Sequence, residues 1–520
     1  MLARVHSAAA FGIEARVLDV EVDVSDGLPC FQIVGLPDAS VKEARERVRS
    51  ALRNSSFPFP GRAITVNLAP ADFRKVGALL DLPVAIGLLL IGGMRVGTPL
   101  RRLFVGELGL TGEVRPVRGA LCLASAARES GFEEMILPAE NAAEAAAVEG
   151  LRVIAVKNLS SAVAHLTGDR QLAPCSAAAA PAPPAAVDFA DIFGQAVARR
   201  ALEIAAAGGH HALLVGPPGA GKTMLARRLP TILPPLTRAE AIEATKIHSV
   251  AGALPHGSGL VEIPPFRAPH HGVSAPGLVG GGTRPAPGEI SLAHKGVLFL
   301  DELAEFRRDV LEAIRQPLEE KRISIVRVGG AHAFPSDFLL VAAMNPCPCG
   351  FAGDARRACR CDRGERQRYA RKVSGPLLDR IDLHVSVPAV PWSDLSRSCP
   401  PEASRSIRDR VVAARGLAAA RAPGRAALRN ADLPVSEFDR ALSLDASGRR
   451  LVATVVERLG LSLRALHRSL RVARTIADLA GSERVSGAHL AEAVGYRIRG
   501  ALDARTVDRT AGTPVPCSSV

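Results

Sequence analysis

Long hydrophobic runs are missing from this chain of 520 residues. The longest apolar stretch, Val84–Met94, is broken by glycine and is shorter than the roughly 20 residues of a membrane-spanning helix. The N-terminus carries Arg4 and His6 but no sustained apolar region with a cleavage site. We therefore expect no signal peptide, no membrane partner and a cytoplasmic location.

A disulfide framework is also missing, because the nine cysteines are odd in number and five of them are scattered. Acidic residues are fewer than basic ones, which gives a net charge of +13. This excess favours a polyanionic partner, and nucleic acid is the first candidate. Arginine and alanine are abundant, so a genomic base-composition bias explains the charge equally well. The hydrophobic content of 48% excludes wholesale disorder.

One glycine-rich stretch fits the pattern G-x-x-x-x-G-K-[ST], between a strand-like run Ala212–Val215 and a helical pattern Met224–Leu229. In this context backbone N–H groups surround the phosphates, Lys222 reaches the terminal phosphates, and the Thr223 hydroxyl can ligate Mg²⁺. ATP and Mg²⁺ are therefore the predicted cofactors. The predicted nucleotide contacts are Gly216, Pro217, Pro218, Gly219, Ala220, Gly221, Lys222, Thr223 and Met224.

A second apolar strand pattern ends in two adjacent carboxylates, Asp301 and Glu302. This is a Walker B arrangement. Asp301 would hold Mg²⁺, and Glu302 would orient and deprotonate the water that attacks the γ-phosphate. The pair predicts hydrolysis in addition to binding.

Two further positions resemble the AAA+ ATPases, in the class that includes magnesium chelatase and the MCM helicases. Asn345 ends a buried strand pattern, as the sensor-1 residue does, although such an Asn also caps turns. Arg380, between Asp379 and Asp382, resembles the arginine finger that a neighbouring subunit supplies. That role implies a homo-oligomer, with a hexamer expected. The alternative is a local ion pair with one of the two aspartates.

Near the C-terminus, Ser462 precedes a long helical pattern and is expected to cap it. Arg464 then falls in the first turn, where the sensor-2 arginine of the family contacts nucleotide. Arg468 and Arg471 lie on the same helical face and are interpreted as an ordinary solvated basic surface.

The first part of the chain alternates as strands do over residues 15–24, which indicates an α+β unit. Segments such as Gly106–Val117 resemble the Lon-protease-like domain of the ChlI and RadA type, which has a ribosomal S5-like fold. The chain departs from that pattern at the catalytic dyad. Val76–Asp81 contains no serine, and Leu121 stands where the lysine is expected. We therefore expect a binding or assembly platform without peptidase activity.

Two insertions flank the Walker B strand: the histidine- and glycine-rich region 265–294 and a hairpin pattern over residues 322–333. With the motifs above, they resemble the YifB/ComM family of magnesium chelatase-like AAA+ proteins over nearly the whole chain. In this branch such loops line a pore, so Arg267, Lys295 and Arg327 become candidate polymer contacts. His270 and His271 are not expected to share a metal, because neighbours on a strand point to opposite faces.

Four cysteines form two close pairs, Cys347 with Cys349 and Cys359 with Cys361. Four thiols in this arrangement favour a tetrahedral structural zinc site. Free thiols and a redox pair are the alternatives.

The expected fold class is α/β, with the Lon-like unit, an Ala/Pro-rich linker and an AAA+ P-loop core under a helical lid. The expected segments are 1–168 (Lon-like), 169–188 (linker), 189–390 (ATPase core), 391–508 (lid) and 509–520 (tail).

The family resemblance implies an ATP-driven ring motor that acts on DNA, as a helicase or in branch migration during recombination or natural transformation. A magnesium chelatase-type subunit and a protein-remodelling chaperone with a protein client are the alternatives. The chelatase hypothesis is weakened by the fused Lon-like unit and by the lack of an evident acidic metal-insertion domain.

Overall fold

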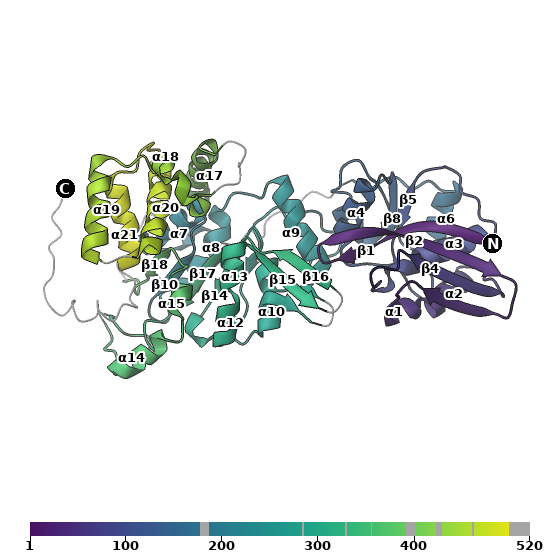
Figure 1. Ribbon diagram of the computed structural model, residues 1–520, viewed down its shortest axis with the longest axis horizontal. Helices are drawn as coiled ribbons and strands as arrows, with labels where there is room; N and C mark the ends of the chain where they lie inside the picture. The colour runs from purple at the N-terminus through teal and green to yellow at the C-terminus, as the bar shows by residue number, and fades with distance from the viewer. Residues whose placement is uncertain are drawn as a thin grey trace.

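The computed structural model describes residues 1–176, 187–282, 285–327, 330–354, 356–391, 401–422, 429–459 and 462–498. Within these residues two large sheets and a helical segment follow one another along an elongated molecule (Figure 1). The mixed α/β character predicted from the sequence is confirmed. The expected tail and residues 177–186 of the expected linker lie outside the described residues. No helix in the described ranges is both long and apolar enough to cross a membrane.

The N-terminal sheet has seven strands in the order β3-β4-β2-β1-β5-β8-β9. Its strands are β1 Leu2–Phe11, β2 Glu14–Ser25, β3 Cys30–Val34, β4 Ala63–Ala69, β5 Arg102–Phe104, β8 Glu134–Pro138 and β9 Arg152–Val156. A short hairpin is formed by β6 Glu107–Leu108 and β7 Val114–Arg115. The helices of this unit are α1 Ala39–Lys42, α2 Ala44–Asn54, α3 Asp81–Ile91, α4 Ala120–Glu129, α5 Ala142–Ala145 and α6 Leu159–Thr167.

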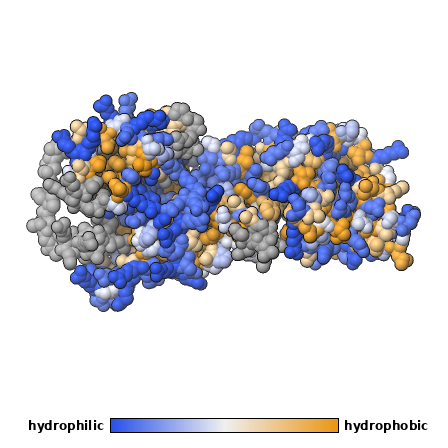
Figure 2. Space-filling view, in the orientation of Figure 1, coloured by the Kyte–Doolittle hydropathy of each residue, from blue (hydrophilic) through white to orange (hydrophobic). Residues whose placement is uncertain are grey.

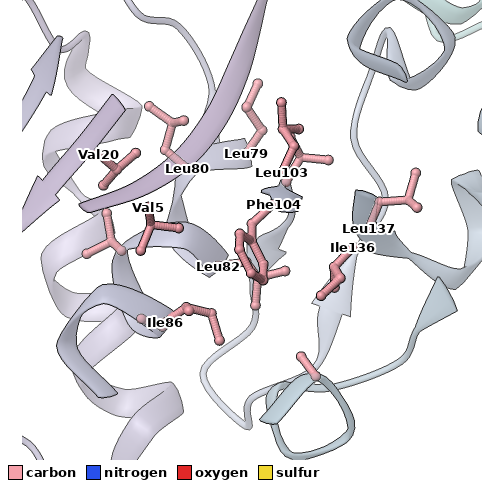
Figure 3. Packing of buried hydrophobic residues seen from close by; sticks show 14 of the residues in the cluster. Val5, Val20, Leu79, Leu80, Leu82, Ile86, Leu103, Phe104, Ile136 and Leu137 are labelled. Atoms are coloured by element: carbon pink, nitrogen blue, oxygen red, sulfur yellow. The ribbon is translucent and has the colours of Figure 1, made fainter. Parts of the chain in front are cut away.

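Alternation along β2 explains how this sheet gains a core. Val20 and its apolar neighbours at every second position are buried, while the residues between them are more exposed. Helix α3 packs against β1 and β2, so Leu82 and Ile86 meet Val5 and Val20 (Figure 3). The apolar run that is too short to span a membrane is therefore a buried core helix.

The second sheet is parallel throughout, in the order β11-β14-β17-β10-β18. Its strands are β10 Ala212–Val215, β11 Phe266–Arg267, β14 Val297–Leu300, β17 Leu339–Met344 and β18 Leu383–Ser386. The helices around it are α7 Ala196–Gly208, α8 Lys222–Ile232, α9 Arg238–Ala251, α10 Ala275–Val279, α11 Glu289–Leu292, α12 Arg308–Ala313, α13 Arg315–Glu320, α14 Arg363–Ala370 and α15 Gly375–Leu378. Two hairpins project from it: β12 Gly280–Gly281 with β13 Ala286–Pro287, and β15 Arg322–Arg327 with β16 Gly330–Pro335.

A helical segment closes the described chain, with α17 Ser404–Ala420, α18 Phe438–Leu442, α19 Ala446–Leu459, α20 Leu463–Leu479 and α21 Gly487–Ile498. It is joined to the parallel sheet by buried ion pairs. Asp382, at the start of β18, pairs with Arg468 of α20 at 2.7 Å and with His210. Asp337, before β17, pairs with Arg429 and with Lys295.

Besides the ion pairs of Glu149 with Arg238 and of Glu140 with His256, the contacts of the N-terminal unit with the ATPase core include two further places. Helix α4 packs on α9, where the Gly119 N–H donates to the Ser249 carbonyl at 3.1 Å. At the second place, the turn after β1 meets the β15–β16 hairpin, and the rings of Phe11 and His332 lie 4.3 Å apart. Ile13 of the same turn packs against the apolar cluster under that hairpin. The sequence resemblance alone did not indicate either contact.

We expect Asp337→Asn to lower the midpoint of thermal unfolding at pH 7 by several degrees, because Arg429 and Lys295 would lose a buried counter-charge. Burial alone would raise the pKa of Asp337, but Arg429, Lys321 and Lys295 lower it well below its usual range. The contribution of the Asp337 carboxylate to the free energy of unfolding is therefore complete above the unfolded-state pKa of about 4. It is lost progressively as the pH falls below that value. Melting curves at pH 7 and pH 3 test this. An equal pH dependence in both proteins would contradict it.

Candidate functional site

The phosphate-binding loop joins β10 to α8 at the carboxyl end of the parallel sheet. Gly219 and Gly221 have positive φ angles of 77° and 89°, a conformation that favours glycine. Gly216 is required by space, because an added Cβ would lie 2.0 Å from the Val387 carbonyl oxygen. The Lys222 ammonium donates to the carbonyls of Gly216 and Pro217 at 2.7 and 2.9 Å, and burial lowers its pKa. The lysine is thus held across the loop that the sequence predicted.

The two predicted Mg²⁺ ligands lie side by side. The Thr223 hydroxyl at the start of α8 donates to Asp301 Oδ2 at 2.6 Å, although 78 residues separate them. Hydroxyl and carboxylate oxygens are ligands that Mg²⁺ accepts. Thr223 follows β10 and Asp301 follows β14, the strands on either side of β17, and the carboxyl ends of these parallel strands lie at one edge of the sheet.

Glu302 has a partner that the sequence did not indicate. Its Oε2 lies 3.3 Å from Nδ1 of His271, and the backbone of Glu302 is left-handed, with φ 52°. The prediction that the two histidines lie on a strand and point apart was wrong. Strand β11 ends at Arg267, the histidines lie in the loop and turn beyond it, and their rings are 4.0 Å apart. His271 also meets the Phe306 ring edge-on, so it is placed between Glu302 and the apolar surface.

Asn345 follows β17 and lies beside the phosphate loop. Its Oδ1 accepts a hydrogen bond from the Lys222 ammonium at 3.1 Å. Strand β17 pairs with β10 in parallel register, Met344 opposite Val215, which places Asn345 next to Gly216. The Asn345 amide is therefore in direct contact with the lysine of the phosphate loop.

The two predicted arginines, Arg380 and Arg464, meet at one carboxylate. Both ion-pair with Glu319 Oε1 of α13, at 2.6 and 2.5 Å. Arg380 also donates to the Pro376 carbonyl, so neither Asp379 nor Asp382 is its partner. The predicted cap is present, since Ser462 accepts from the Ala465 N–H at 3.2 Å.

Arg468 and Arg471 do not form the solvated face expected for them. Arg468 is only 16% exposed and pairs with Asp382, while Arg471 donates to the Leu433 carbonyl and lies over the Phe438 ring. Their partners come from remote parts of the chain, which a helical spacing cannot reveal. Both arginines therefore hold the helical segment together and to the sheet.

The candidate polymer contacts are also paired within the chain. Arg267 makes a two-pronged ion pair with Glu289 at 2.7 and 2.8 Å, and Lys295 pairs with Asp337 at 3.0 Å. Arg327 ends β15, and its side chain lies outside the described residues. The sequence did not reveal the carboxylate partners of the first two cations.

The sequence did not indicate a pocket of about 750 Å³ that lies near the phosphate loop but is lined by other segments. It lies between the start of α7, the residues after β18, and α21, and Gln195, Val390 and Tyr496 are among its lining residues. The Gln195 amide donates to the carbonyls of Ala220 and Pro388. The pocket is thus joined to the loop through one side chain.

Comparison with known proteins agrees with this geometry. The family model "Magnesium chelatase, subunit ChlI" matches residues 188–395, that of "Subunit ChlI of Mg-chelatase" matches 20–141, and that of its C-terminal part matches 401–497. The competence protein ComM of Haemophilus influenzae is 44% identical over 95% of this chain and 97% of its own length. The YifB protein of Escherichia coli is 43% identical, with the same coverage. The chain belongs to the YifB/ComM family of magnesium chelatase-like proteins.

A magnesium-chelatase 67 kDa subunit of Chlorobaculum parvum is 28% identical over only 31% of the chain and 23% of its own length. The likeness to the chelatase subunit is therefore partial, whereas the likeness to YifB/ComM proteins spans the whole architecture. Membership of this family makes the chain a ChlI-type AAA+ ATPase.

In the N-terminal unit of this YifB/ComM-family chain, the two segments that the sequence analysis compared with a Lon-type dyad carry apolar side chains. Ala78 begins a short 3-10 helix, Ala78–Leu80, and Leu121 is fully buried in α4. The neighbouring Cys122 thiol faces the Lys246 carbonyl of α9, and burial raises its pKa to about 12. Helix α4 at this position is thus packed against α9 of the ATPase core.

The four paired cysteines converge after Asn345. Their sulfur atoms all lie within 4.8 Å of one another, with Cys347 and Cys359 at 3.7 Å and Cys349 and Cys359 at 3.7 Å. Zinc–sulfur bonds of about 2.3 Å in a tetrahedron place the sulfurs roughly 3.8 Å apart. Backbone N–H groups donate to the sulfurs of Cys347 and Cys361, which favours thiolates. The donor set therefore fits a tetrahedral metal.

We expect His271→Ala to lower ATP turnover about ten- to a hundredfold with little change in ATP affinity, because Glu302 would lose its positioning contact. His270→Ala is the matched control, since His270 Nδ1 accepts from the Gly272 N–H and has no ion pair with Glu302 among the described residues. Steady-state turnover and nucleotide titration check both variants. Equal rates in the two variants would contradict the assignment.

Proposed function

We propose that this chain is an ATP-hydrolysing ring motor, a hexamer, that acts on DNA as a helicase or in branch migration. The observation that carries the ATPase part is the convergence at one sheet edge of Lys222, Asn345 and the Thr223–Asp301 pair. ATP would place its phosphates on the Gly216–Thr223 loop and its base in the pocket beside Gln195.

In this proposal Glu302 orients the attacking water and accepts its proton, and His271 fixes the Glu302 carboxylate. Mg²⁺ supplies charge neutralisation at the β- and γ-phosphates when bound, held by Thr223 with Asp301. Asn345 links the γ-phosphate position to β17. Each role follows from a contact within a single chain.

Arg380 is proposed to act on the nucleotide of a neighbouring copy. Its described partners are Glu319 and the Pro376 carbonyl, and neither belongs to its own phosphate loop. Arg464 shares Glu319 with it, so we assign both guanidiniums to the same face between subunits. In a ring, the neighbouring subunit would present the γ-phosphate of its nucleotide to Arg380 and Arg464.

DNA is the proposed polymer for two reasons. One relative that covers 95% of this chain is named a competence protein, and the net charge of +13 suits a polyanion. Porphyrin metallation by a chelatase-type subunit and remodelling of a protein client are the other outcomes that the same assay separates.

The four-thiol site is proposed to hold a structural zinc ion. The purified protein is expected to carry about one zinc per chain, and Cys359→Ser is expected to lose it. Cys30→Ser, an exposed cysteine outside the cluster, is the matched control. Metal analysis and the charge-transfer bands of a cobalt-exchanged sample measure this. A fully loaded Cys359→Ser protein would exclude the four-thiol site.

ATP hydrolysis with and without single-stranded, duplex and forked DNA tests the function. We expect stimulation that fades with salt, no turnover in Lys222→Ala, and at least a roughly 100-fold reduction in Glu302→Gln with ATP binding retained. Unchanged turnover with DNA, but stimulation by a porphyrin or an unfolded polypeptide, would favour the alternatives. Retained hydrolysis in Glu302→Gln would remove its assignment as the base.

Mixing two inactive variants tests the subunit arrangement. Arg380→Ala is expected to turn over about a thousandfold more slowly. Adding Lys222→Ala subunits should restore part of the activity, because an intact phosphate loop then meets an intact Arg380 from its neighbour. A mixture of Arg380→Ala with Arg464→Ala subunits is the comparison, because both changes affect the same face between subunits. No recovery in the first mixture would contradict action in trans.

A further inference from the structure

An arginine-rich surface lies over the four-thiol site and α14 and has no role in the reaction described above. Residues 356–372 contain eight Lys or Arg and only two acidic residues. Figure 2 shows hydrophilic residues covering the place where α14 projects from the molecule in Figure 1. The exposed arginines of this arginine surface are Arg356, Arg357, Arg360, Arg363, Arg368 and Arg371.

Both carboxylates within the segment are already engaged by backbone. Asp362 accepts from the Glu365 N–H at 2.8 Å, and Glu365 accepts from the Asp362 N–H at 3.0 Å, which closes a capping box at the start of α14. Asp354 accepts the N–H groups of Arg356 and Arg357, and Glu305 pairs with Lys372. The carboxylates in and beside this segment are therefore already engaged within the chain, mostly by its backbone.

Five exposed arginines therefore have no ion pair within the part of the chain that the structure describes. Among the described residues, no carboxylate lies within ion-pairing distance of Arg356, Arg357, Arg360, Arg368 or Arg371. Arg267 and Arg468, in contrast, have carboxylate partners inside the chain. This contrast indicates that the arginine surface is built for an anion supplied from outside.

The four thiols hold the first part of this surface in shape. Cys359 and Cys361 flank Arg360, and their sulfurs converge with those of Cys347 and Cys349. Further along, Tyr369 is buried and anchors α14 to the core, while Arg368 and Arg371, three residues apart, project nearby. Ordered guanidiniums lose less entropy on binding than those of a free loop.

We propose that the arginine surface binds the phosphate backbone of nucleic acid. The repeated phosphates of a strand match several unpaired guanidiniums in one ordered segment, whereas a single small anion would engage one or two. This inference rests on the proposed action on DNA and assigns a place for it on the outside of the ATPase core.

The test compares DNA binding by the full chain and by a triple variant, Arg356→Ala with Arg357→Ala and Arg360→Ala. The probe is a labelled single-stranded or duplex oligonucleotide followed by anisotropy over a salt series. We expect about tenfold weaker binding, and a slope of log K against log salt that is shallower by about 0.9 for each duplex phosphate that the variant no longer neutralises. The same three positions changed to Lys should recover most of the affinity.

The matched control removes three exposed arginines of the N-terminal unit that have no ion pair among the described residues, Arg53, Arg95 and Arg170. This control should bind DNA as the unsubstituted chain does. Equal weakening in the control would mean that overall charge alone is measured and would overturn the proposal. Cys361→Ser, which keeps all the arginines, should also bind more weakly, and unchanged binding would overturn the role of the thiols in presenting them.

The outcomes for the surface and for the function are distinguishable. If the unsubstituted chain binds DNA and the triple variant binds it equally well, the proposed role of the arginine surface is overturned, whereas the proposed function is not affected. If the unsubstituted chain neither binds DNA nor is stimulated by it, both are overturned. A triple variant that fails to form the ring, as judged by mass photometry with nucleotide, would assign the surface to a neighbouring copy instead and overturn the proposal.

Discussion

Parallel pairing of β10 between β17 and β18 is the constraint on which the rest of the site depends. Met344 and Ser386 both lie opposite Val215, so the chain after each of these strands leaves the sheet at the same edge. Gly216 has to pass against the Val387 carbonyl, where no Cβ fits. The phosphate loop, Asp301 and Asn345 are consequently neighbours because of register. A change in the register of one strand would separate Asn345 or Asp301 from the phosphate loop.

The parts of the site that the sequence predicted are those encoded locally. The phosphate loop, the Asp301–Glu302 pair and the Ser462 cap each occupy a few consecutive residues, so spacing and strand or helix pattern suffice. Partners of charged groups were not predictable, because Glu319 and Arg464 are 145 residues apart in the chain and meet only after folding. The His271 contact was missed for a different reason. Strand alternation was applied to a segment that lies beyond the end of β11.

Sharing of Glu319 by Arg380 and Arg464 has a consequence for control of hydrolysis. The Arg380 side chain is 9% exposed, whereas the carboxylate is 45% exposed, so this ion pair lies at the surface and is weakened by water. A phosphate from a neighbouring subunit offers more charge and more acceptor oxygens than one carboxylate. The two arginines would therefore exchange Glu319 for phosphate only when a neighbouring subunit with bound nucleotide is present. Under the proposed action on a neighbour's nucleotide, the contact that holds the two arginines in a single chain would make their release depend on assembly.

The four-thiol segment connects the arginine surface to the nucleotide site by direct packing. Gly350, with φ 84°, lies so close to the phosphate loop that an added Cβ would be 2.6 Å from Pro218. Tyr369 of α14 is buried and interacts with the backbone of Asn345, and Lys372 pairs with Glu305 beyond the Walker B strand. A strand of DNA held on this surface would pull on α14 and on the cysteine segment together. Both pack against residues of the nucleotide site, Pro218 and Asn345, so under the proposed function this packing would couple DNA on the surface to the γ-phosphate.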